Sequence, residues 1–215
     1  MNINVSTESI DLMDSAISSK KTGTFETYYD SGRIKEKWTL KNGKLEGSFK
    51  SYFESGQLET KATYKNGIQD GALETYFETG QLESKGTNKK GMQDGIWEKY
   101  YTSGQLFLRL NYKNDKEEGL SESFYTNGQQ KSKAYYKDGK LNGFFERYYQ
   151  GGELEARVHY VSGIKDGIHE TYYTNGRIEE KVDYKSGKPE GVWELYNQRG
   201  VMVEQRTYKD GEEVL

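Results

Sequence analysis

The sequence predicts an all-β fold, an elongated, single-layer, twisted antiparallel β-meander built from eight 24-residue hairpin repeats. Glycine recurs every 24 residues from Gly23, and a second glycine follows nine residues later in each repeat. Runs rich in Tyr, Phe, Thr and Leu alternate with Asp/Asn/Ser-Gly turns, and no apolar stripe of helical period survives between the glycines. A fixed period of this length is typical of an array of one supersecondary unit.

The first repeat illustrates the predicted elements. Residues 24–29 and 33–40 read as strands, separated by Asp30-Ser31-Gly32 and followed by Lys41-Asn42-Gly43. A third glycine column occupies this second turn and is interrupted only by Asp115, a residue type that tolerates left-handed backbone. Three residues with glycine last suit a type I turn closed by a left-handed residue. We therefore predict three-residue turns throughout and roughly sixteen strands over residues 23–215.

The turn length predicts which residues share a face, because opposed strand residues point to the same side of a sheet. This register places Tyr28 opposite Ile34, and Phe25 opposite Lys37. The face with the aromatic column is predicted to be packed; that column is Tyr28, Tyr52, Tyr76, Tyr100, Phe124, Tyr148, Tyr172 and Tyr196. The face with Phe25, Trp97 and their equivalents is predicted to stay accessible.

Residues 1–22 lie outside the period. Ile10, Met13 and Ile17 follow Ser6 and Thr7 at helical spacing, a weak pattern for a short capped helix. Terminal repeats need a cover for their exposed edge, so we expect this segment to be a cap or else a loose segment.

Composition restricts the classes of partner. A net charge of −3 and a pI near 5.6 give no electrostatic reason to expect nucleic acid or an anionic membrane. There is no Cys, and so no disulfide framework or zinc-thiolate site. The sequence shows neither a signal peptide nor a membrane-spanning segment, so we expect a cytoplasmic protein.

The repeat resembles a known family. The pattern Gly-x-Trp/Phe-Glu-x-Tyr-Tyr-x-x-Gly-x-Leu, then Tyr-Lys-x-Gly-x-x-x-Gly, is similar to the MORN-type repeat, in the variant found in bacterial proteins of the YwqK-like antitoxin family. The resemblance covers residues 23–214. It implies a single-layer sheet used for interaction, with scaffolding, dimerisation, lipid contact or neutralisation of a toxin as its possible uses.

The sequence gives little support for a catalytic site or a metal site. Glu26 and its equivalents form a carboxylate column, and Glu46 and its equivalents form another. Neighbours within a column would lie about 9.6 Å apart, too far to share one cation. His159 and His169 stand in different columns without a third ligand. We therefore expect no enzyme activity, no catalytic residues, no cofactor and no metal site.

The fourth repeat departs most from the pattern. Phe107 replaces a charged residue, and the predicted register groups it with Trp97, Tyr101 and Arg109. Trp, Tyr and Arg dominate interface hot spots, so these four residues are the predicted partner-binding patch. Drift within a degenerate repeat is the alternative interpretation.

The function predicted from the sequence is a non-enzymatic protein-binding repeat protein, an antitoxin or immunity protein that neutralises a toxin. The alternatives are a MORN-type scaffold or membrane-peripheral protein and, less favoured, a cell-wall or glycan-binding repeat protein. Glycan-binding repeats recur near 20 residues, which counts against the last. The sequence leaves the partner's identity and the oligomeric state open.

Overall fold

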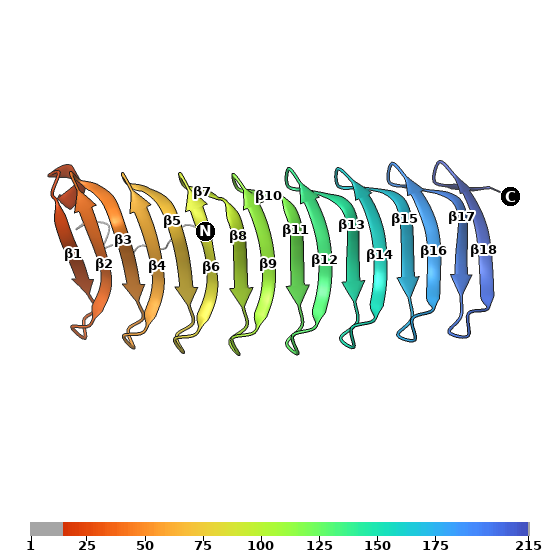
Figure 1. Ribbon diagram of the computed structural model, residues 1–215, viewed down its shortest axis with the longest axis horizontal. Coiled ribbons are helices and arrows are strands. Elements are labelled where there is room, and N and C mark those ends of the chain that lie inside the picture. Colours follow the sequence, from red (N-terminus) through yellow and green to blue (C-terminus); the bar gives the residue numbers. More distant parts are fainter. Residues whose placement is uncertain (1–14, 215) are drawn as a thin grey trace. The chain divides into compact units, whose positions relative to one another are not determined.

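The computed structural model describes residues 15–214 and confirms the all-β antiparallel meander (Figure 1). Its contacts divide the chain into two compact units, Met1–Gly104 and Gln105–Leu215, and each is described by itself. No helix within the described residues is long and apolar enough to cross a membrane. The cytoplasmic location stays a prediction.

In the first unit, eight strands follow one another in chain order. They are β1 (Gly23–Tyr28), β2 (Ile34–Lys41), β3 (Lys44–Tyr52), β4 (Leu58–Lys65), β5 (Ile68–Tyr76), β6 (Leu82–Lys89), β7 (Met92–Gln93) and β8 (Gly95–Tyr100). Each strand from β1 to β6 pairs antiparallel with its successor, and β6 pairs with both β7 and β8.

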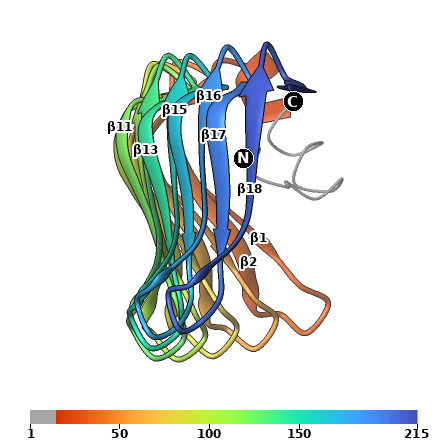
Figure 2. The same ribbon diagram turned by 90° about the vertical axis from the view of Figure 1, so that its right-hand side faces the viewer.

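The second unit continues the pattern with eleven strands, and Figure 2 shows β11 to β18 as one layer. They are β9 (Leu106–Lys113), β10 (Lys116–Glu117), β11 (Gly119–Phe124), β12 (Gln130–Lys137), β13 (Lys140–Tyr148), β14 (Leu154–Val161), β15 (Ile164–Tyr172), β16 (Ile178–Lys185), β17 (Lys188–Tyr196), β18 (Met202–Lys209) and β19 (Glu212–Val214).

The first turn of each hairpin has the predicted three-residue form. In the first repeat, the amide of Tyr29 donates to the carbonyl of Arg33 at 2.8 Å, and the amide of Gly32 donates to the carbonyl of Tyr29 at 2.8 Å. Gly32 has a φ of 78°, in the region that glycine occupies without steric cost. The prediction of a turn closed by a left-handed glycine is confirmed here.

The second turn is shorter than predicted. Lys41 pairs directly with Lys44, so only Asn42 and Gly43 form the loop. Both have positive φ, 52° and 73°, which is the type I′ turn whose twist matches that of the flanking strands. Asp115 keeps this geometry with a φ of 65°, as expected for a residue that tolerates left-handed backbone.

The opening glycine of the repeat lies within a strand rather than in a turn. Gly47 has a φ of 81° inside β3, where the register shifts relative to β2. This bulge interrupts the strand completely at two places, separating β7 from β8 and β10 from β11. The described residues therefore contain nineteen strands where we predicted about sixteen.

A second bulge overturns the predicted faces. Tyr28 pairs with Ile34 as expected, but Thr27 pairs with Glu36, so Lys35 is an extra residue on β2. Beyond it, Phe25 pairs with Trp38 and not with Lys37. A slip of one residue moves every side chain of a strand to the other face.

We call the side carrying Phe25, Trp38, Leu40 and their equivalents the core face, and the side carrying Glu26, Tyr28, Lys37 and their equivalents the outer face. The prediction that the Tyr28 column is the packed face is wrong. Tyr28 is 52% exposed, whereas Trp38 and Leu40 are fully buried. The physical reason is the bulge, which brings a second row of apolar side chains opposite Phe25 and its equivalents.

The segment before β1 takes part in the repeat's hydrogen bonding. Residues 15–18 form a helical turn, and Ala16 is buried. The carbonyl of Lys21 accepts from the Gly43 amide at 2.8 Å, as the carbonyl of Leu45 does from the Gly67 amide at 2.8 Å. The predicted helical pattern from Ile10 and Met13 lies outside the described residues.

Candidate functional site

The structure places the four predicted binding residues in two different units. Trp97 and Tyr101 belong to the first unit, and Phe107 and Arg109 to the second. Trp97 is only 5% exposed, and its indole Nε1 donates to the carbonyl of Thr87 at 3.3 Å. The interpretation of Trp97 as an exposed contact residue is therefore wrong, because the bulge turns its column into the core face.

Phe107 and Arg109, the two residues of that patch in the second unit, remain accessible. Phe107 stands at the repeat position that Lys35 occupies in the first repeat, and it is exposed. Arg109 pairs with Glu122 across β9 and β11, with 3.5 Å between guanidinium and carboxylate. A joint patch of all four residues stays a prediction.

The first carboxylate column is tied to neighbouring side chains on the outer face. Glu26 accepts from the Tyr28 hydroxyl and the Lys37 ammonium, each at 2.7 Å. The hydrogen bond from Lys37, followed by that from Tyr28, lowers the pKa of Glu26. The same Tyr–Glu bond recurs at Glu74, Glu98, Glu146, Glu170 and Glu194. Glu26, whose pKa is lowered in this way, is a poor proton donor at neutral pH.

The second carboxylate column has a structural role that was not predicted from the sequence. Glu46 accepts from the backbone amide of Asn66, twenty residues later in the chain, at 2.8 Å. Equivalent bonds join Glu118 to Asp138, Asp166 to Ser186, and Glu190 to Asp210. Each carboxylate thus holds the next type I′ turn. The fixed spacing of 20 residues between each carboxylate and its turn residue is the feature of the sequence that could have indicated this role.

The two histidines show no sign of metal binding. His169 lies on the core face, and burial lowers its pKa, which favours the neutral form. His159 Nδ1 lies against the carbonyl of Asp166 on the same sheet. Within residues 15–214, no group of three His, Asp or Glu side chains is arranged to hold a metal ion.

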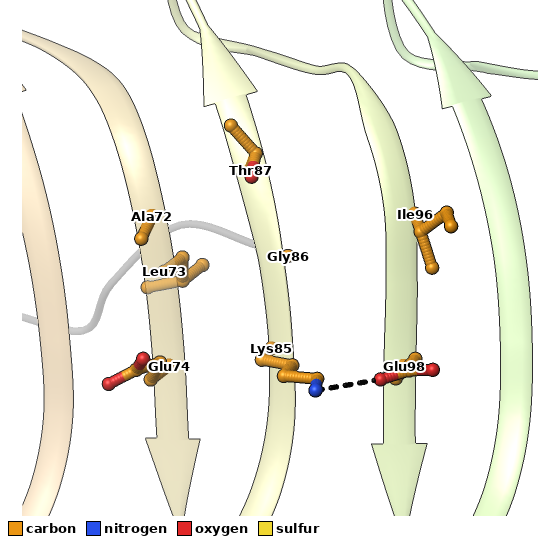
Figure 3. A pocket seen from close by; sticks show the side chains of 8 residues that line it. All are labelled: Ala72, Leu73, Glu74, Lys85, Gly86, Thr87, Ile96 and Glu98. Atoms are coloured by element: carbon orange, nitrogen blue, oxygen red, sulfur yellow. Dashed lines mark ion pairs between the residues drawn. The ribbon is translucent and has the colours of Figure 1, made fainter.

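A shallow hollow of about 400 Å³ lies on the first unit (Figure 3). Its walls come from β5, β6 and β8, with small side chains at Ala72 and Thr87. Lys85 and Glu98 reach toward each other across it and form an ion pair of 2.9 Å. The charges at this hollow are thus compensated internally, so it offers little to attract a charged ligand.

An exposed apolar cluster of the second unit lies near one of its type I′ turns. Val161 and Ile164 pair with each other across the turn between β14 and β15, and Ile168 follows on β15. Their exposed fractions are 46%, 52% and 36%. Strand alternation puts Ile164 and Val161 on the outer face, because the adjacent pair, Tyr160 and Lys165, belongs to the core face.

Lysine pairs flank this cluster on both sides. Lys137 pairs directly with Lys140 one repeat earlier, and Lys185 pairs with Lys188 one repeat later. All four lysines are exposed. The arrangement, an apolar centre between charged borders, matches the anatomy of protein interfaces. We define these seven residues, with Val161, Ile164 and Ile168 at the centre, as the rim site.

Aromatic side chains also occupy the outer face of β13 and β14. Phe144 on β13 packs edge-on against His159, with 4.9 Å between ring centroids. The Arg157 guanidinium stacks over the Phe144 ring at 3.9 Å. Val161 is the last residue of β14, and Ile164 and Ile168 lie on β15, so the apolar cluster is presented by strands rather than by a loop.

Comparison with known proteins identifies the repeat. Seven segments match the family model described as MORN repeat variant, and together they span more than half of the chain; they are residues 21–42, 45–66, 69–89, 93–114, 117–138, 165–186 and 189–210. The matched segments leave out residues 139–164, which hold Val161 and Ile164. A search of curated proteins found no match.

Proposed function

The chain belongs to the MORN repeat variant family, and we propose that it is a non-enzymatic binding protein that holds a protein partner on the outer face of its second unit. The observation that carries the proposal is the exposure of Val161, Ile164 and Ile168 on the strands β14 and β15. Contiguous apolar surface on an ordered element, bordered by charge, is typical of an interaction site.

The chemistry of the described side chains supports binding over catalysis. The carboxylates that a catalytic pair would need are hydrogen-bonded to Tyr hydroxyls, to Lys ammonium groups or to turn amides. The pKa of Glu26 and that of Glu74 are lowered, whereas a general acid requires a raised pKa. Enzyme activity therefore has no support from the titrating groups.

We further propose the antitoxin role, the use suggested by resemblance to YwqK-like proteins. In this form the partner is a toxin that the rim site covers. A scaffold or membrane-peripheral role is the alternative, and the lysine pairs of the rim site are the observation that favours it. The localisation expected for the antitoxin is the cytoplasm, where its partner would be neutralised.

The test compares two isoleucines at the same repeat position. Ile164→Asp places a charge in the rim site, whereas Ile68→Asp places one at the equivalent exposed position of the first unit. In affinity purification from the source cells, we expect Ile164→Asp to lose a protein that both the wild type and Ile68→Asp retain. Recovery of the same proteins by all three forms would contradict binding at this face.

The antitoxin form has its own readout. Co-expression of the captured protein should arrest growth, and co-expression of the wild-type chain should restore it. Ile164→Asp should fail to restore growth, while Ile68→Asp should succeed. A captured protein that is harmless on its own would refute the antitoxin role and leave the binding function standing.

A further inference from the structure

The rim site repeats at a spacing that its partner must match. Three successive turns present Lys137 with Lys140, then Val161 with Ile164, then Lys185 with Lys188. Each repeat contains two strands, and adjacent strands lie about 4.8 Å apart. The residue pairs at successive turns are therefore about 9.6 Å apart. The two lysine pairs are therefore separated by about 19 Å, with the apolar pair midway.

The lysine pairs are charges without compensation. Like charges directly opposite each other on neighbouring strands destabilise a sheet. None of these four lysines forms an ion pair within the part of the chain that the structure describes. The nearby carboxylates of Asp166 and Glu190 are engaged by turn amides, and Asp138 is the single acid at the tip of these three turns. The site thus favours a partner with carboxylates.

Backbone geometry selects among the possible partner conformations. A polyproline II helix has three residues per turn and rises about 3.1 Å per residue, so side chains three apart share a face and lie about 9.3 Å apart. An extended strand covers a similar distance in three residues, but its side chains alternate and the middle one would point away. An α-helix needs about seven residues, or roughly 10.5 Å, to return to the same face.

We propose that the rim site binds an extended segment in the polyproline II conformation, with acidic, apolar and acidic residues at successive third positions. The acidic residues face the two lysine pairs, and the apolar residue contacts Val161 and Ile164. The mismatch between 9.3 and 9.6 Å is about 0.3 Å per repeat, which side-chain flexibility absorbs over three repeats. This inference rests on the proposed function and names the chemistry of its partner.

The experiment measures fluorescence anisotropy of labelled peptides with the full chain. The probe is a proline-rich peptide with Glu, Leu and Glu at successive third positions. One control peptide replaces both Glu by Lys, a second spaces the three residues by two, and a third is a helical peptide with the three residues spaced by seven. We expect the probe to bind at least tenfold more tightly than each control.

The matched protein variant is the double substitution Val161→Lys/Ile164→Lys. It copies the Lys137–Lys140 pair that the neighbouring turn already carries, so the fold should persist. We expect it to weaken probe binding at least tenfold. Lys185→Ser/Lys188→Ser should weaken binding and reduce its salt dependence, while Lys65→Ser in the first unit should leave both unchanged.

Each other outcome overturns the inference. Tighter binding of the helical peptide, or equal binding of the charge-reversed peptide, contradicts the polyproline II segment. Sedimentation with phosphatidylserine vesicles in the absence of peptide binding would assign the lysines to a membrane surface. If no peptide binds while Ile164→Asp still loses its cellular partner, this inference fails and the proposed function survives.

Discussion

The two units are built from one repeat, but the apolar residues that they bury on the core face differ in size. In the first unit, the core face buries Trp38, Leu40, Phe49, Leu73 and Trp97. In the second, the buried apolar residues are the smaller Ala134, Ala156, Val158 and Val182.

At one position of the outer face, the side chains become larger and more apolar along the chain. The residue after each opening glycine is Thr24, Ser48 or Ala72 in the first three repeats. From Ile96 onward it is apolar throughout; the later members are Leu120, Phe144, Ile168 and Val192. The same backbone pattern therefore has two uses. Large apolar side chains on the core face add stability, whereas those on the outer face leave apolar surface for a partner.

Removing one tryptophan from each unit tests this comparison with the largest expected effect. Trp97→Ala should lower the free energy of unfolding by about 3–5 kcal/mol, because it empties a buried site. Trp193→Ala should cost only about 1–2 kcal/mol, because that ring is half-buried under Arg206. Urea titrations followed by circular dichroism measure both. Equal losses would show that the two core faces contribute alike.

The second largest loss of stability is expected from a substitution at a single glycine of the first unit. Gly86 lies on the core face, where an added Cβ would stand 2.2 Å from the Trp97 indole. Gly86→Ala should therefore destabilise the protein by about 1–3 kcal/mol through overpacking. The double variant Gly86→Ala/Trp97→Leu recreates the Ala62–Leu73 pair of the preceding repeat and should recover part of that loss. Failure to recover would place the strain elsewhere.

Substitutions in the type I′ turns should change the free energy of unfolding by a smaller amount. Lys90 holds a φ of 53°, where Asn is tolerated better than a long side chain. Lys90→Asn should raise the free energy of unfolding by about 0.5 kcal/mol, and the reverse change at the equivalent position, Asn66→Lys, should lower it by a similar amount. Thermal unfolding of the two variants provides the measurement, and shifts of the same sign would contradict the argument.

The smallest expected difference concerns pH. In the first unit, hydrogen bonds from Lys37 and Lys61 lower the pKa of Glu26 and Glu74, so their stabilisation is complete above the ordinary carboxyl pKa and is lost as pH falls through the lowered pKa. In the second unit, burial raises the pKa of Glu117, so its contribution is largest at low pH and is lost as pH rises through the raised pKa.

Acidification should therefore weaken the first unit before the second. A variant with Trp193→Phe reports the first unit by fluorescence, and a variant with Trp38→Phe and Trp97→Phe reports the second. Acid titration from about pH 6 to pH 3 should show the first signal changing at the higher pH. Coincident transitions would mean that the two units lose stability together.

The sequence alone determined the repeat, its period, the strand class and the left-handed turn positions. These follow from local chemistry, because glycine takes positive φ at little steric cost, as Gly32, Gly43 and their equivalents do. The two-residue length of the second turn was not among them, since the sequence had predicted three residues there. The membership of the MORN repeat variant family follows from the same pattern.

Only the tertiary structure decided which face is buried. The extra residue at Lys35 and its equivalents leaves no mark in composition or period, because a bulge is a property of how two strands pair. That one residue placed Trp97 in the core, where the sequence had suggested a binding surface. It also placed Ile168 on the outer face, beside the turn where Val161 meets Ile164. Face assignment depends on cross-strand register, which a repeat shows only when its strands are seen together.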